Sequence, residues 1–117
     1  MTTRELASVA LDDKYTSTTG RVYLSGIQAL VRLMLVQGWR DRAAGLDTAG
    51  FVSGYRGSPL GGIDEALWHA QPHLDANRVK FRPGVNEELA ATAVWGTQQV
   101  HLTGGSEVDG VYAMWYG

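Results

Sequence analysis

The chain has 117 residues, of which 44% are hydrophobic and 19% charged, and its formal net charge is −2 at pH 7. This length and composition suit one small folded domain and argue against two domains or a disordered chain. The balanced charge makes nucleic acid and anionic membranes poor candidates for the main partner. The chain has no cysteine, which excludes disulfides, thiolate catalysis and cysteine-ligated iron–sulfur or zinc sites within it.

No segment has the pattern of a signal or a membrane span. Residues 1–14 carry several charged side chains and no long apolar run, so we do not expect a secretory signal. The most apolar helical segment, residues 24–36, is interrupted by Ser25, Gln28 and Arg32, which argues against a transmembrane helix. We therefore expect a cytoplasmic protein.

Residues 1–19 are expected to be a polar lead-in, with loop composition at 16–20, and residues 20–117 an α/β domain. Helices and strands are predicted to alternate along that domain, as helix 25–44, strand 48–53, helix 63–70, strand 78–82, helix 86–101 and strand 110–115. Pro72 is expected to stop the second helix, because proline lacks the N–H group that a helix interior needs.

Strands that alternate with helices predict a parallel sheet with right-handed crossovers. Ligands of such sheets bind in the crevice outside the carboxyl ends of the strands. Two segments follow strands in this way, the loop 54–62 and the turn 83–87. Both are therefore candidate ligand-binding segments.

The loop Gly54-Tyr55-Arg56-Gly57-Ser58-Pro59-Leu60-Gly61-Gly62 suits a small carboxylate. Its glycines let the backbone take positive φ and approach a ligand, Arg56 can donate two parallel hydrogen bonds, and Ser58 offers a hydroxyl. The loop also leads into a helix N-terminus, which favours an anion. The Gly-Lys-Ser/Thr ending of a phosphate loop is missing. An ordinary strand–helix turn with an exposed arginine explains these residues equally well.

The helix start at Asn86 combines an N-cap residue with two acids, Glu87 and Glu88. Both acids suit the helix dipole, and for Glu88 we favour this capping role. Partial burial just after a strand end would instead suit Glu87 to exchanging a proton with a heterocycle. His69 and His73 are four residues apart and could share a helix face as metal ligands. Pro72 lies between them, however, and no Glu-x-x-His pattern supports a site, so no metal site is expected.

Three stretches together resemble the N-terminal region of the long, fused indolepyruvate ferredoxin oxidoreductases of bacteria. They are FVSGYRGSPLGG at 51–62, PGVNEELAATAVWG at 83–96 and DGVYAMWYG at 109–117. The resemblance covers residues 20–117 and implies a partial pyrimidine-binding domain of the three-layer thiamine-diphosphate-binding fold. It also implies oxidative decarboxylation of aryl 2-oxoacids with coenzyme A, with electrons passing through iron–sulfur clusters to ferredoxin.

The resemblance assigns roles to four residues. Glu87 matches the catalytic and cofactor-binding acid that hydrogen-bonds N1′ of the aminopyrimidine, promotes its imino tautomer and helps deprotonate the thiazolium C2. Ser58 matches the threonine of a Tyr-Pro-Gly-Thr-Pro type loop near the substrate. Arg56, where that loop has its proline, and Gly57 would also contact the substrate.

Two signatures of the family are missing from this chain. There is no Gly-Asp-Gly…Asn motif for the diphosphate and magnesium, and there are no cluster cysteines. Thiamine diphosphate would therefore be shared with another domain, and magnesium and the iron–sulfur clusters would lie elsewhere in the full enzyme. The expected partners are the remaining domains or subunits, ferredoxin and, in the full enzyme, a second copy in a dimer.

We accordingly expect a fragment that is inactive alone. Two alternatives stay open: a non-enzymatic module that binds a small carboxylate, and a non-functional truncated product that exposes an apolar helix.

Overall fold

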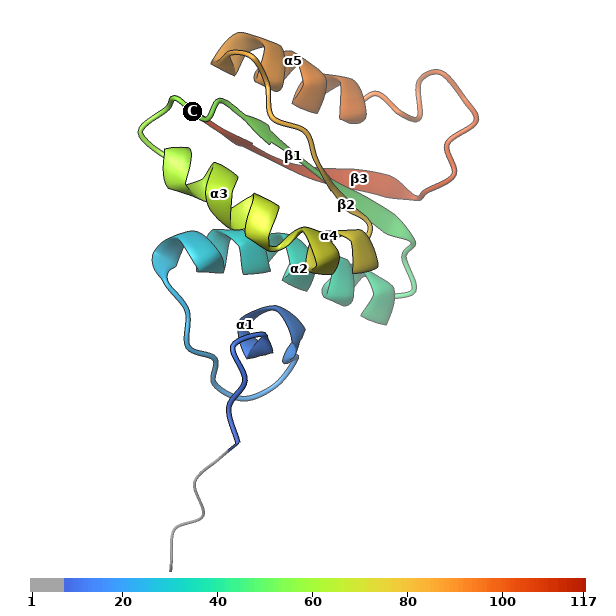
Figure 1. Cartoon of the computed structure of the whole chain (residues 1–117). Coiled ribbons are helices and arrows are strands. Elements are labelled where there is room, and N and C mark those ends of the chain that lie inside the picture. The colour runs from blue at the N-terminus through green and yellow to red at the C-terminus, as the bar shows by residue number, and fades with distance from the viewer. Residues whose placement is uncertain (1–7) are drawn as a thin grey trace, which may run out of the picture.

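A three-stranded parallel sheet with helices on both faces forms the fold in the computed structural model, which describes residues 8–117 (Figure 1). The elements follow in the order α1 (Asp13–Thr16), α2 (Gly26–Ala43), β1 (Thr48–Gly54), α3 (Gly61–His69), α4 (Gln71–Ala76), β2 (Val79–Phe81), α5 (Glu87–Thr97) and β3 (Gly110–Tyr116). The predicted α/β class and parallel sheet are confirmed.

The strand order is β2-β1-β3, so β1 is the central strand and pairs in parallel with both neighbours. Phe51 in β1 lies opposite Lys80 in β2 and Ala113 in β3. Because all three strands run the same way, their carboxyl ends meet at one edge of the sheet. That edge lies at the left of Figure 1, together with the C-terminus and the first turns of α3 and α5.

The helices form two layers around the sheet. Helix α5 packs on one face, against β1 and β3, whereas α2, α3 and α4 cover the other (Figure 1). The core lies between the sheet and this second group of helices, where its largest fully buried hydrophobic side chains are Phe81, Leu35, Ile63, Leu67, Leu74, Val31, Val52 and Val79. No helix within residues 8–117 is both long enough and apolar enough to cross a membrane.

The caps of the first long helix follow the sequence closely. The Ser25 hydroxyl accepts a hydrogen bond from the Gln28 N–H, and the Gln28 side chain accepts one from the Ser25 N–H, which is a complete capping box. After the helix, Gly45 has a φ of 81°, a conformation that favours glycine. These two local signals explain why the predicted bounds of α2 differ little from those observed.

Three elements differ from the sequence-based expectation. Helix α3 does end at His69, but Pro72 then occupies the first turn of α4, where the missing N–H group is not needed. Helix α5 ends at Thr97 and not at 101, and the Gln98 side chain donates to the Val111 carbonyl of β3. In the polar lead-in, residues 13–16 form α1, whose Tyr15 is buried in the core.

Candidate functional site

The two predicted ligand-binding segments lie side by side at the carboxyl edge of the sheet. The Arg82 N–H donates to the Val52 carbonyl at 3.0 Å, and the Gly84 N–H donates to the Gly54 carbonyl at 2.9 Å. These bonds continue the β1–β2 pairing beyond the end of β2. The start of α5 is therefore held next to the end of the central strand.

Glu87 is the first residue of α5 and is half-buried. The helix start is fixed by Asn86, whose side-chain oxygen accepts from the Leu89 N–H at 2.8 Å. The main chain of Glu87 is also fixed, because its carbonyl accepts a hydrogen bond of 3.0 Å from Trp115 Nε1. Its carboxylate makes no hydrogen bond or ion pair with any other residue in 8–117. Glu87 thus presents a positioned but unpaired acid beside the ends of β2 and β3.

Behind this edge lies a buried pair that the sequence analysis did not single out. The Tyr116 hydroxyl donates to Asp64 Oδ1 at 3.2 Å, and both residues are less than a tenth exposed. Burial, followed by the charge of Asp64 and this hydrogen bond, raises the pKa of the Tyr116 phenol well above its usual range. The sequence does hold a signal for the burial of Asp64, since with Leu60, Ile63 and Leu67 it follows the spacing of one helical face.

Arg56, Gly57 and Ser58 all lie in the loop between β1 and α3, as expected. Two backbone N–H groups of this loop bond to carbonyls within it: Ser58 donates to the Tyr55 carbonyl and Gly61 to the Ser58 carbonyl. The Leu60 N–H donates to the Ser58 hydroxyl oxygen at 3.2 Å. The N–H groups of Arg56 and Gly57 donate to no other group among residues 8–117, so the loop keeps backbone donors for an anion beside the Arg56 side chain.

The positive φ predicted for the glycines of this loop is wrong. Within the described residues, none of them has a positive φ. At residue 54 the backbone lies so close to the Tyr116 ring that a Cβ would be 2.5 Å from it, so only glycine fits there. At Gly61 an added Cβ would lie 2.6 Å from the Arg56 carbonyl oxygen. These glycines let the chain pack on itself.

Arg56 lines a hollow of about 310 Å³ together with Gly61, Asp64, Glu65 and Trp68. Glu87 and Ser58 do not line this hollow. The structure thus brings Arg56 together with two carboxylates and an indole, and it leaves Glu87 on the helix that covers the other face of the sheet (Figure 1).

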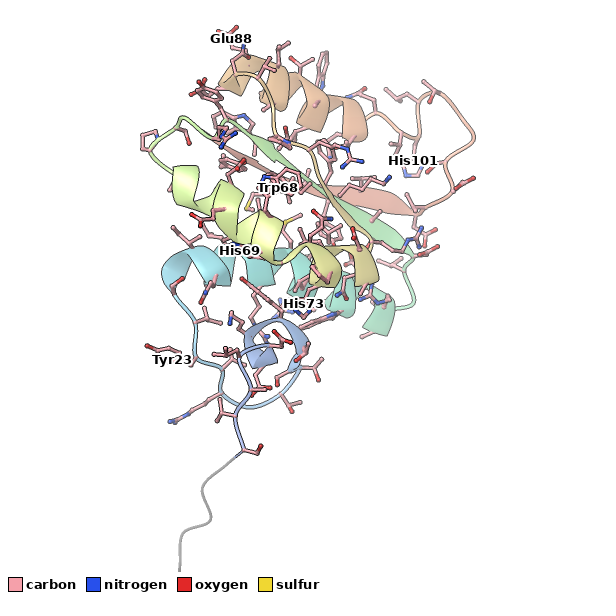
Figure 2. All side chains as sticks on the ribbon, viewed as in Figure 1. Tyr23, Trp68, His69, His73, Glu88 and His101 are labelled. Atoms are coloured by element: carbon pink, nitrogen blue, oxygen red, sulfur yellow. The ribbon has the colours of Figure 1, made fainter. Side chains whose placement is uncertain are left out.

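His69 and His73 lie on α3 and α4 beside a second hollow, of about 450 Å³, at the N-terminal part of the chain (Figure 2). The His73 ring packs against Tyr15, and its Nε2 lies 3.8 Å from Asp12 Oδ1. Within residues 8–117 there is no group of three histidines or acids that could hold a metal ion. Through these contacts His73 helps to hold the segment around Asp12 and Tyr15 against the helical layer.

Comparison of the chain with protein-family models, with curated proteins and with solved structures finds no match.

Proposed function

We propose that this chain is the pyrimidine-binding part of a thiamine-diphosphate-dependent oxidoreductase that resembles indolepyruvate ferredoxin oxidoreductase. The full enzyme would oxidatively decarboxylate aryl 2-oxoacids with coenzyme A and pass electrons to ferredoxin in the cytoplasm. One observation carries the proposal: Glu87, at the carboxyl edge of a parallel sheet, is half-buried and its carboxylate has no hydrogen-bond or ion-pair partner among residues 8–117. This edge is where parallel α/β sheets bind their ligands.

The residues around Glu87 suit an aminopyrimidine. The Asn86 cap and the Trp115 hydrogen bond hold the helix start in place, so the carboxylate has a defined position without a competing partner among residues 8–117. Val85, just before the helix start, is an exposed apolar side chain that a flat heterocycle can contact. Glu87 would hydrogen-bond the pyrimidine ring nitrogen and exchange a proton with it. The bound cofactor would supply an electron sink for the decarboxylation.

Arg56, Gly57 and Ser58 would lie on the substrate side of this site. Arg56 would bind the carboxylate of the 2-oxoacid, and the Ser58 hydroxyl, which only accepts a hydrogen bond in the present structure, remains able to donate one. Magnesium, the diphosphate-binding residues and the iron–sulfur clusters would come from another domain or subunit. On this proposal the chain has no activity by itself.

The test is the rate of 2-oxoacid-dependent ferredoxin reduction by an assembled enzyme that contains this chain. Glu87→Gln keeps the size of the side chain and removes its acid function, and we expect kcat to fall by about 10²- to 10⁴-fold. Glu88→Gln is the matched control, because Glu88 is the exposed neighbour in the same helical turn. Near-normal rates for Glu87→Gln would remove the proposed role of this residue.

A further inference from the structure

The hollow next to Arg56 has an aromatic wall. Trp68 projects from α3 toward β2, where its ring meets Phe81 edge-on, with the ring centroids 4.9 Å apart (Figure 2). About half of the Trp68 side chain stays exposed. An indole that is fixed on one side and open on the other offers a rigid surface to an apolar or cationic group.

The hollow also holds charges of both signs that do not neutralise one another. Arg56 forms no ion pair with Asp64 or Glu65, since the ion pairs found within residues 8–117 involve other residues. A guanidinium and two carboxylates therefore line one small space while remaining separate. A ligand with only a negative charge would meet two carboxylates, and a ligand with only a positive charge would meet the guanidinium.

Asp64 adds a second, independent indication. It is 7% exposed, yet only one of its oxygens is hydrogen-bonded, to the Tyr116 hydroxyl. A buried carboxylate normally has more of its acceptor positions satisfied. Among residues 8–117 only the Tyr112 hydroxyl is fully enclosed without a partner, so the second oxygen of Asp64 is not completely enclosed, and Asp64 lines the hollow.

We propose that this hollow binds a zwitterionic α-amino acid with an aromatic or large apolar side chain. The ligand carboxylate would bind the Arg56 guanidinium by two hydrogen bonds, and its ammonium would bind Asp64 and Glu65. Its side chain would lie along the Trp68 ring. The volume of about 310 Å³ is at the lower end of the range for small-molecule sites, about 300 to 1,000 Å³.

This inference goes beyond the proposed function. It shares Arg56 with that function, but it involves neither Glu87 nor thiamine diphosphate. Each proposal can therefore fail while the other stands.

The experiment is calorimetric titration of the complete 117-residue chain with three probes. L-Phenylalanine carries both charges, phenylpyruvate lacks the ammonium and phenethylamine lacks the carboxylate. We expect phenylalanine to bind about ten-fold or more tightly than either single-charge probe, because each charged contact contributes a hydrogen bond to an ionised group.

Variants identify the groups responsible. Glu65→Gln and Asp64→Asn should weaken phenylalanine binding about ten-fold without weakening phenylpyruvate binding, whereas Arg56→Gln should weaken both. Glu65 is exposed, so its variant keeps the test valid if loss of the Asp64–Tyr116 contact unfolds the chain. Glu107→Gln, in the exposed loop before β3, is the matched control and should leave all affinities unchanged.

Three results would overturn the proposal. Phenylpyruvate binding as tightly as phenylalanine would make the hollow a plain anion site, and equally tight phenethylamine binding would make it a cation site. The absence of binding heat with phenylalanine at millimolar concentration would remove the site altogether.

Discussion

Gly54 is the position where a single methyl group should do most damage to the carboxyl edge of the sheet. In Gly54→Ala the new Cβ would lie 2.5 Å from three ring atoms of Tyr116, including Cγ at the root of the ring. Tyr116 is 3% exposed and its hydroxyl is held by Asp64. The ring therefore cannot turn aside without losing both its packing and its hydrogen bond.

The expected magnitude follows from these two losses. Forcing an extra methyl group into a packed core costs about 1–3 kcal/mol. Complete loss of a hydrogen bond to a charged group costs about 1.5–3 kcal/mol. Because the two effects overlap, we expect the free energy of unfolding to fall by about 3 kcal/mol, a large share of the roughly 5–15 kcal/mol of a typical domain.

Urea unfolding followed by circular dichroism measures this change. With an m-value of about 2 kcal/mol/M, the midpoint should fall by about 1.5 M. Gly96→Ala is the matched control, because a Cβ on Gly96 in α5 would meet no atom within 4 Å. It should stabilise the chain by about 0.5–1 kcal/mol, since alanine favours a helix interior. A Gly54→Ala midpoint within about 0.2 M of the parent would refute the packing described here.

Three further predictions concern single side chains. Among residues 8–117 the Tyr112 hydroxyl is enclosed without a hydrogen-bond partner. In urea unfolding, Tyr112→Phe should therefore leave the free energy of unfolding unchanged or raise it by up to about 1 kcal/mol. Burial and Asp64 raise the pKa of Tyr116. The stability that the protonated Tyr116 phenol contributes is therefore fully present below about pH 10 and is lost as the pH rises further. Urea titrations at about pH 8 and about pH 11 should therefore show a smaller alkaline loss for Tyr116→Phe than for the parent. Asn86→Ala should lower the free energy of unfolding by about 1 kcal/mol because the hydrogen bond to the Leu89 N–H is lost, whereas Asn86→Asp should keep most of it.

The parallel sheet and the position of Glu87 were predictable from sequence because both rest on local signals. Glycine and proline mark the ends of the strands, and the Asn86 cap sets the start of α5. The alternation of helices and strands then places the strand ends at one edge.

The N-terminal part of the chain was less predictable because its structure depends on distant contacts. Helix α1 is only four residues long and has no hydrophobic repeat of its own. Arg32 in α2 holds it in place by donating hydrogen bonds to the Lys14 and Ser17 carbonyls, at 2.9 and 2.8 Å. Such tertiary hydrogen bonds leave no periodic pattern in the sequence.

The hollow contains side chains that the sequence of the loop alone does not reveal. In the sequence of the loop, Arg56 is the only cationic residue and stands next to a helix N-terminus. This pattern predicts an anion site. Asp64 and Glu65, near the start of α3, line the same hollow as Arg56.

The two carboxylates also separate the proposed function from the amino-acid site. A 2-oxoacid carries only a negative charge and is repelled by both, whereas the ammonium of a zwitterion is attracted to them. Glu65→Gln should therefore lower the affinity for phenylalanine, and it should leave the KM for the 2-oxoacid unchanged or lower it. A fall in affinity of the same size for both ligands would mean that Glu65 does not act through its charge on the ligand at Arg56.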